Sequence, residues 1–254
     1  MPARTADIIA FLDDLLETHR FEDYGPNGLQ VPGAAQVETV ASGVSANLEL
    51  FERALAHGAQ LVLAHHGILW RSQPLRIDAT QAARLKLLLT HDLALGAYHL
   101  PLDAHLEHGN NALLATGLGA SELTPAFPSK GTPIGVIARF DDPGVPAAEL
   151  TARVARLTER EPLAFDAGPA HVRTLGIVSG GGASFLNDAI GAGLDAFLTG
   201  EPAEWAMASA REAGIHFIAA GHYATETLGI RRIGELVAER FGVAHTFIPV
   251  PNPV

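Results

Sequence analysis

The chain has 254 residues, 48% of them hydrophobic, and a formal net charge of −11. This length is sufficient for one large domain or for two lobes of about 125 residues. No cysteine is present, which excludes disulfides, iron–sulfur clusters, thiolate metal sites and cysteine nucleophiles. Lysine occurs twice, at Lys86 and Lys130, so the sequence lacks the clustered positive charge that nucleic-acid binding requires.

The amino-terminal segment 1–19 carries apolar residues at helical spacing, and acidic residues interrupt them. It has neither the basic start nor the cleavage site of a secretory signal, so it predicts an amphipathic helix. No apolar run approaches the roughly eighteen residues that a membrane span needs. We therefore expect a cytoplasmic protein without a membrane partner.

Strand-like and helical segments alternate along the chain, an order that favours an α/β fold with mainly parallel or mixed sheets. In the first half, strands are expected at 39–44, 60–66 and 93–99, with helices between them. The segment 121–132 is rich in Pro, Ser, Gly and Thr and breaks this order. We expect the boundary there, between a first α/β lobe over 1–125 and a second over 126–254. The terminal segments can pack on the opposite lobe.

The two halves of the sequence resemble each other. Residues 39–67 align with residues 174–202, strand on strand and helix on helix, and Gly58 aligns with Gly193. This match predicts two similar lobes that arose by internal duplication. In parallel sheets, chemistry collects beyond the carboxyl ends of the strands. The polar residues at these ends are His65, His66, His99, Glu201 and His222.

Two adjacent histidines, His65 and His66, end the apolar segment LVLAHH. Neighbouring residues in a strand point to opposite faces, so both rings can share a site only where the strand unwinds. Gly67 supplies the freedom to do so. The pair could be metal ligands, or it could cap a strand end with imidazoles that have protein partners.

A second group of polar residues follows the next strand, in the segment AYHLPLDAHLEHGNN. Pro101 forces the chain to leave the sheet there. The candidate ligands in this segment are His99, Asp103, His105 and His108. Without thiolates, neutral imidazole and carboxylate are the ligands that Zn, Mn, Fe, Co or Ni accept. The alternative is a polar surface loop.

His222 closes a strand in the second half, and Glu226 lies four residues later. If a helix begins near residue 223, the two side chains lie on one face, as two metal ligands would. The same pair is also common on ordinary helices.

Two glycine-rich segments allow more than one interpretation. The turn 179–182 could hold an anion with its backbone N–H groups, or it could be a tight structural turn. Asn27 and Gln30, in the turn-rich segment 23–33, could contact a ligand or hold a loop. No catalytic serine motif and no Walker loop occur in the sequence.

In order and spacing, the segments DYGPNGLQV, LVLAHHGILW, AYHLPLDAH, GNN, SGGG, DAFLTGE and GHYATETLG resemble the Nif-three-like family of dinuclear-metal proteins, also described as type 2 homologues of GTP cyclohydrolase I. The resemblance covers nearly the whole chain. It implies two similar interlinked α/β lobes, a toroidal homohexamer and a site for two divalent metal ions. The ligands that it implies are His65, His66, Asp103, His222 and Glu226. Pro202 departs from the family pattern, which leaves the local roles of Glu201 and Glu204 open.

The resemblance and the strand-end residues lead to the hypothesis of a metal-dependent hydrolase. Two divalent ions about 3.5–4 Å apart lower the pKa of a bridging water and polarise the bond that is attacked. His99 and His105 are the expected proton carriers, unless they only support the ligands. The expected substrate is a nucleotide or a similar heterocyclic amide, with GTP cyclohydrolase-like ring opening as the specific version. The alternative is a non-catalytic metal-binding or regulatory hexameric scaffold.

Overall fold

The computed structural model describes residues 2–254, which divide into two compact units. Unit 1 comprises the residues up to Leu102 together with Gly229–Val250. Unit 2 comprises Asp103–Leu228 together with Pro251–Val254. The chain thus divides at 102/103 and not at the expected 125/126, and Asp103 belongs to unit 2.

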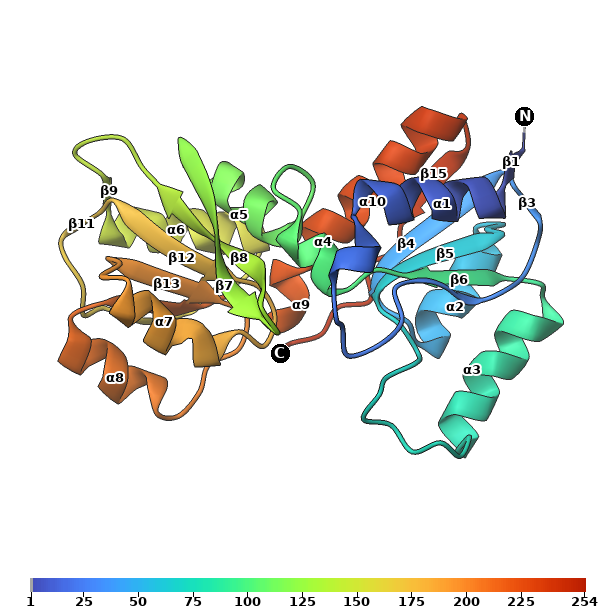
Figure 1. The fold of residues 1–254 in the computed structure, drawn as a ribbon, viewed down its shortest axis with the longest axis horizontal. Helices are drawn as coiled ribbons and strands as arrows, with labels where there is room; N and C mark the ends of the chain where they lie inside the picture. The colour runs from blue at the N-terminus through green and yellow to red at the C-terminus, as the bar shows by residue number, and fades with distance from the viewer. Residues whose placement is uncertain (1) are drawn as a thin grey trace. The chain divides into compact units, whose positions relative to one another are not determined.

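The sheet of unit 1 contains three adjacent parallel strands, β4 (Thr39–Ser45), β5 (Leu61–His66) and β6 (Ala94–Ala97). Their residues are almost all buried, which explains why these segments are continuous apolar runs instead of alternating ones. β15 (Ala244–Phe247) pairs in parallel with β4, and β2 (Gly28–Val31) pairs antiparallel with β6 (Figure 1).

Helices cover both faces of this sheet. Figure 1 shows α1 (Thr5–Leu15) and α10 (Thr227–Phe241) on one face, and α2 (Leu48–Ala56) and α3 (Ala79–Thr90) on the other. Phe11 and Phe241 join α1 to α10, with ring centroids 5.7 Å apart in an edge-to-face contact. The amphipathic helix predicted near the amino terminus is therefore present as α1.

The sheet of unit 2 is also built on three adjacent parallel strands. These are β12 (Thr174–Val178), β13 (Ala196–Thr199) and β14 (His216–Ala219). Antiparallel strands extend the sheet on both sides. They are β10 (Leu163–Phe165) beside β14, and β8 (Thr132–Arg139) with β7 (Glu122–Ser129) beside β12.

Figure 1 shows α5 (Asn110–Leu118) and α6 (Ala147–Thr158) on one face of this second sheet, and α7 (Leu186–Gly191) and α8 (Ala206–Ala213) on the other. Leu114 and Leu118 of α5 are buried in one apolar core with Leu175 and Leu198 of the sheet. Because α5 buries its apolar side chains on this sheet, it belongs to unit 2. The remaining short elements are β1 (Ala3–Arg4), η1 (Thr18–Arg20), β3 (Gln36–Val37), α4 (Leu100–Ala104), β9 (Val145–Pro146), β11 (His171–Val172), η2 (Ala183–Phe185) and α9 (His222–Thr225).

The segment 121–132, expected as an irregular lobe boundary, instead forms strand β7 and the turn into β8. β7 lies at the edge of its sheet, where a proline does not cost a ladder hydrogen bond, so Pro125 and Pro128 are tolerated. Phe127 of the same strand is buried. The expected boundary was wrong because prolines typical of a linker also fit an edge strand.

Both units contain the same β-α-β-α-β order, β4-α2-β5-α3-β6 in unit 1 and β12-α7-β13-α8-β14 in unit 2. Gly58 and Gly193, which the sequence repeat aligns, follow α2 and α7 with φ angles of 71° and 68°. Such left-handed positions after a helix favour glycine. The predicted α/β fold with parallel and mixed sheets is confirmed, and the two units share the arrangement that the repeat predicted.

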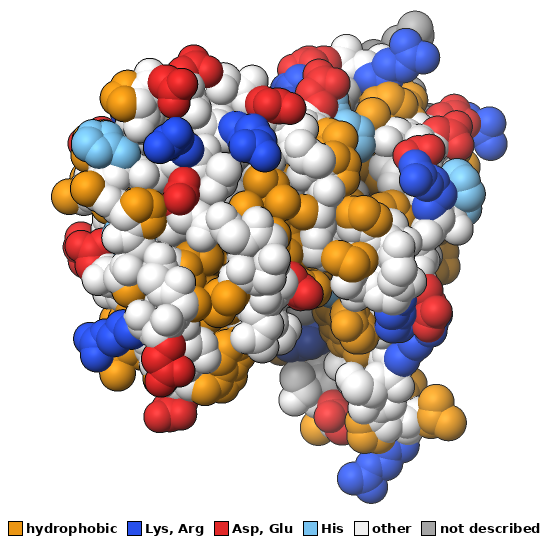
Figure 2. Space-filling view, turned by 60° about the vertical axis from the view of Figure 1, so that its left-hand side comes forward, with side chains coloured by type: hydrophobic (Ala, Val, Ile, Leu, Met, Phe, Trp, Pro, Cys, Tyr) orange, Lys and Arg blue, Asp and Glu red, His pale blue; other side chains and the backbone are white. Residues whose placement is uncertain are grey.

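Charged side chains are dispersed over the face that Figure 2 presents. Figure 2 shows Lys and Arg side chains interspersed with Asp, Glu and uncharged residues on the face it presents. Some arginines pair with an acid one helical turn away, as Arg53 does with Glu49 and Arg153 with Glu149. In residues 2–254, no helix has both the length and the apolar character that crossing a bilayer requires.

Candidate metal-ligand clusters

In each unit, polar side chains follow the carboxyl ends of the parallel strands, as the sequence predicted. In unit 1, His65 and His66 end β5, and His99 follows β6. In unit 2, Glu201 follows β13 and His222 follows β14. These residues lie at one edge of each sheet because parallel neighbours end on the same side.

Three imidazoles of unit 1 form a histidine cluster, defined here as His65, His66 and His99. Their candidate ligand nitrogens lie within 4.8 Å of one another. The ring centroid of His65 is 4.7 Å from that of His66 and 5.1 Å from that of His99. His65 is completely buried, so the cluster is part of the folded unit and not a solvated surface group.

Gly67 permits this arrangement for a steric reason. A Cβ at Gly67 would come within 2.3 Å of the Gln30 side chain. Gln30 Oε1 accepts a hydrogen bond from the backbone N–H of Ile68, at 2.9 Å, and thereby holds the chain just beyond the two histidines. Gly67 is therefore required because the Gln30 side chain approaches its backbone closely, and Gln30 holds the end of the strand. This contact assigns Gln30 to holding a loop.

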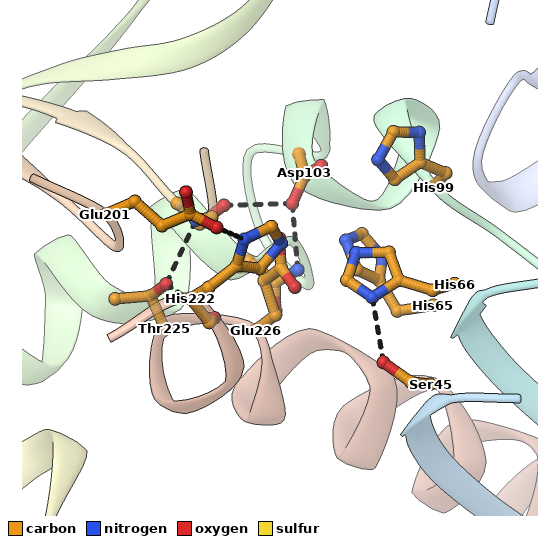
Figure 3. A network of polar contacts seen from close by, with 12 residues as sticks. Ser45, His65, His66, His99, Asp103, Glu201, His222, Thr225 and Glu226 are labelled. Carbon is orange, nitrogen blue, oxygen red and sulfur yellow. Dashed lines mark hydrogen bonds and ion pairs between the residues drawn. The ribbon is translucent and has the colours of Figure 1, made fainter. Parts of the chain in front are cut away.

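Each imidazole of the histidine cluster uses Nδ1 in a hydrogen bond with an oxygen of unit 1. His65 Nδ1 lies 2.9 Å from the carbonyl oxygen of Tyr98, and His66 Nδ1 lies 3.0 Å from Ser45 Oγ (Figure 3). His99 Nδ1 lies 2.8 Å from Asp23 Oδ1. Nε2 is therefore the atom that each ring can offer to a cation, an arrangement typical of metal-ligating histidines.

Asp23 and Ser45 were not singled out as site residues from the sequence. Asp23 lies in the turn-rich segment 23–33, and no sequence motif marks Ser45. Burial by itself would raise the pKa of Asp23, but the hydrogen bond and charge of His99 lower it, and the net shift is downward. The carboxylate is thus held in its ionised form next to His99.

Unit 2 contains an acidic cluster, defined here as Asp103, His222 and Glu226. Carboxylate oxygens of Asp103 and Glu226 lie within 4.8 Å of each other, and the two residues are only 6% and 3% exposed. Asp103 Oδ1 accepts hydrogen bonds from Asn110 Nδ2 at 2.9 Å and from Ser179 Oγ at 3.0 Å (Figure 3). These donors fix the orientation of the Asp103 carboxylate.

His222 lies between two carboxylates. Its Nε2 is 3.2 Å from Glu226 Oε1, and its Nδ1 is 2.5 Å from Glu201 Oε1 (Figure 3). Burial alone would lower the pKa of His222, but the hydrogen bonds and charges of Glu226 and Glu201 raise it to about 9. A metal ion at Nε2 requires the neutral ring, so metal binding must displace this proton.

The pair His222 and Glu226 does not lie on one continuous helix. α9 ends at Thr225 and α10 begins at Thr227, with Glu226 between them at φ −113°. A helix does begin near residue 223, but it is interrupted at Glu226. The two side chains still meet, because α9 is one turn long and keeps the four-residue spacing.

The turn 179–182 packs against the acidic cluster. Gly180 N–H donates to Thr225 Oγ1 at 3.0 Å, and Gly180 O accepts from the backbone N–H of Gly200 at 2.9 Å. A Cβ at Gly180 would come within 2.2 Å of Glu226 Oε1. These contacts support the structural interpretation of the turn, since Gly180 uses its backbone groups inside the unit.

The structure places His105 in a local contact. Its Nδ1 accepts hydrogen bonds from the backbone N–H groups of Glu107 and His108, at 3.2 Å and 3.0 Å. Its ring stacks on that of His108, with centroids 5.0 Å apart. His99 is thus brought to the predicted ligands of unit 1, whereas the proton-carrier role of His105 stays a prediction.

Comparison with known proteins gives full-length matches. Residues 3–253 match the Duf34/NIF3 (NGG1p interacting factor 3) family. A Pseudomonas aeruginosa protein called GTP cyclohydrolase 1 type 2 homolog is 41% identical over 100% of both chains, and an Escherichia coli protein of the same name is 40% identical over 98% of this chain and 99% of its own.

Two solved structures share this fold over their entire length. The protein ybgI superposes with a TM-score of 0.92 at 39% identity, covering 99% of this chain and 100% of its own. A Thermus thermophilus protein superposes with a TM-score of 0.90 at 34% identity, with the same coverage. These matches confirm the resemblance predicted from the sequence motifs.

We predict that Gly180→Ala destabilises the metal-free protein more than Gly193→Ala does. Both glycines have a positive φ, 61° and 68°, so a side chain at either carries the strain of left-handed backbone. Only Gly180→Ala also places a Cβ against Glu226, and such overpacking costs about 1–3 kcal/mol. Denaturant unfolding measures both variants. Equal free energies of unfolding would contradict the close packing of Gly180 on Glu226.

The raised pKa of His222 predicts a pH-dependent stability of the metal-free protein. Because folding favours protonated His222, its contribution to the free energy of unfolding is complete below pH 6.5 and is lost as the pH rises through about 9. Urea unfolding at a series of pH values should show this decline, and His222→Gln should flatten it. An unchanged slope in His222→Gln would show that other groups cause the decline.

Proposed function

Because this chain belongs to the Duf34/NIF3 family, we propose that it binds two divalent metal ions per chain and uses them to hydrolyse a nucleotide or a similar heterocyclic amide. The proposed ligands are His65, His66, Asp103, His222 and Glu226. Zn, Fe, Mn, Co and Ni are the candidate metals, since all accept imidazole and carboxylate. The toroidal homohexamer implied by the resemblance is part of the same proposal.

The observation that carries metal binding is the pair of buried carboxylates in the acidic cluster. Oxygens of Asp103 and Glu226 lie within 4.8 Å of each other, and both residues are almost completely buried. Two ionised carboxylates at this separation repel each other strongly when water is excluded. A divalent cation held by both removes this repulsion. The acidic cluster therefore has the charge that a cation would balance.

The remaining donors also fit a divalent metal. His65 and His66 can present Nε2 to a metal, because their Nδ1 atoms are hydrogen-bonded to the Tyr98 carbonyl and to Ser45 Oγ. The Tyr98 carbonyl can only accept, so it fixes His65 as the Nδ1–H tautomer that a metal at Nε2 needs. Asn110 and Ser179 orient Asp103 in the same way. Hydrogen-bonded imidazoles alone would also fit a capped strand end. The convergence of ligand nitrogens from His65, His66 and His99 within 4.8 Å of one another favours the ligand interpretation.

When bound, divalent ions supply Lewis acidity, which lowers the pKa of a water and polarises the bond under attack. The chain itself has to move protons and hold the ligands. His99 is the proposed proton carrier, because its ring contacts the rings of His65 and His66 and its Nδ1 is held by Asp23. Glu201 orients His222 from the side opposite Glu226.

The names of the relatives support a nucleotide as substrate. Proteins about 40% identical to this chain over nearly its full length are called GTP cyclohydrolase 1 type 2 homologs. Opening of the guanine ring with release of formate is therefore the specific reaction to test first. The net charge of −11 supports a small molecule over a nucleic acid as the partner.

Metal content is the first test of this proposal. We predict two ions per chain by elemental analysis after loading with Mn²⁺ or Zn²⁺ and removal of excess metal. Asp103→Asn should bind fewer ions, whereas Asp188→Asn, a matched change at an exposed position of α7, should bind two. Absence of bound metal, or equal metal content in both variants, would contradict the proposed ligand set.

Turnover separates the hydrolase from the scaffold. Metal-loaded protein incubated with GTP should release formate, and Asp103→Asn should lower the rate by at least about 100-fold, since loss of an outer ligand contact alone costs 10–100-fold. Asp188→Asn should retain the rate. Protein that binds both ions but converts neither GTP nor a panel of phosphoesters and amides would contradict hydrolysis and favour the metal-binding scaffold.

A further inference from the structure

Asp23 lies outside the proposed ligand set, but its carboxylate makes four hydrogen bonds inside unit 1. Its side chain is buried, and both of its oxygens accept hydrogen bonds. Oδ1 accepts from the Tyr24 N–H at 2.6 Å and faces His99 Nδ1 at 2.8 Å. Oδ2 accepts from Asn27 Nδ2 and from the Leu100 N–H, each at 2.9 Å.

The backbone of His99 is held by the same segment. The His99 N–H donates to Asn27 Oδ1 at 2.8 Å, while the next N–H, that of Leu100, donates to Asp23. Trp70 contacts the His99 ring edge to face, with centroids 5.2 Å apart. The ring is therefore fixed in position by its backbone, by Asp23 and by Trp70.

This geometry determines which nitrogen of His99 carries the proton. Asp23 Oδ1 can only accept, so His99 Nδ1 must donate, and the neutral ring is the Nδ1–H tautomer. The lone pair then resides on Nε2. The His99 side chain is 21% exposed, so the ring is not sealed from solvent.

We propose that Asp23 is a positioning residue that fixes His99 as the Nδ1–H tautomer, so that Nε2 accepts a proton during hydrolysis. This inference rests on the proposed function. As water attacks the substrate carbon, its O–H bond breaks and an Nε2–H bond forms on His99. The proton then passes from Nε2 to the leaving nitrogen as the C–N bond breaks. Asp23 stays ionised throughout and stabilises the imidazolium, as a carboxylate does behind a general-base histidine.

A purely structural role for Asp23 would hold the turn 23–27 without affecting the protonation of His99. Nitrogen-15 NMR of histidine-labelled, metal-free protein separates the two roles, at a pH about two units above the ordinary histidine pKa. For the unchanged protein, we expect a protonated Nδ1 and an unprotonated Nε2 on His99. A proton on Nε2 would overturn the inference, and this measurement requires no variant to fold.

The variant Asp23→Asn provides the second measurement. Its amide can present an N–H to His99 Nδ1, which shifts the proton to Nε2. The nitrogen-15 chemical shifts of His99 should then show an unprotonated Nδ1 and a protonated Nε2. Asp195→Asn is the matched control, because Asp195 also accepts backbone N–H groups, those of Arg173 and Thr174, but in unit 2. The control should leave the His99 signals unchanged. Unchanged His99 signals in folded Asp23→Asn would overturn the inference.

Activity then links the tautomer to catalysis. GTP turnover by metal-loaded Asp23→Asn should fall about 10- to 100-fold with two ions still bound, and it should fall no further in Asp23→Asn combined with His99→Gln than in His99→Gln alone. Additive losses would show that Asp23 acts by a route other than His99. Absence of GTP turnover in the unchanged protein would reject the specific proposed function instead, and with it the proton-acceptor role.

Discussion

The parallel register of three neighbouring strands determines where polar side chains gather in each unit. In unit 1, Ala64 of β5 pairs with Ala97 of β6, so His65, the next residue of β5, and His99, two residues after Ala97, lie at the same edge of the sheet. In unit 2, Thr199 pairs with Ala219, and the chain reaches Glu201 and His222 within three residues of these positions. A slip of one residue in either ladder would turn these side chains to the opposite face.

Burial of polar groups is costly unless they have hydrogen-bond partners. Each Nδ1 atom of the histidine cluster has one, a carbonyl, a hydroxyl or a carboxylate. In the acidic cluster, Asn110 and Ser179 donate to Asp103, and the ring of His222 faces Glu226. In the metal-free protein, a proton on His222 supplies part of the charge that a divalent cation would supply. Metal binding and the protonation of His222 are therefore expected to compete.

Much of the fold could be predicted because its signals are local. Buried parallel strands are continuous apolar runs. Because residues 39–67 align with residues 174–202, the same strand-helix-strand order is predicted for both halves of the chain. The candidate ligands could be found because strand ends in parallel sheets concentrate chemistry. The division of the chain at 102/103 could not, because it depends on which sheet α5 and β7 pack against.

The partners of the ligands were harder to predict than the ligands. Asp23 meets His99 across 76 positions of sequence, and Ser179 meets Asp103 across the same separation. No periodic pattern encodes such a contact, since it arises only once loops from different strands are brought together. The contact of Gly180 could not be predicted either. The sequence indicates a glycine-rich turn, but it does not indicate that Glu226 Oε1 approaches this turn closely.

The five proposed ligands of two divalent ions are His65, His66, Asp103, His222 and Glu226. A crystal structure of the protein loaded with Zn²⁺, with diffraction recorded on both sides of the zinc absorption edge, tests this ligand set most directly. We expect two anomalous peaks per chain, each bonded to nitrogens or oxygens of these residues and otherwise only to solvent. Peaks bound elsewhere, or none at these side chains, would contradict this ligand set.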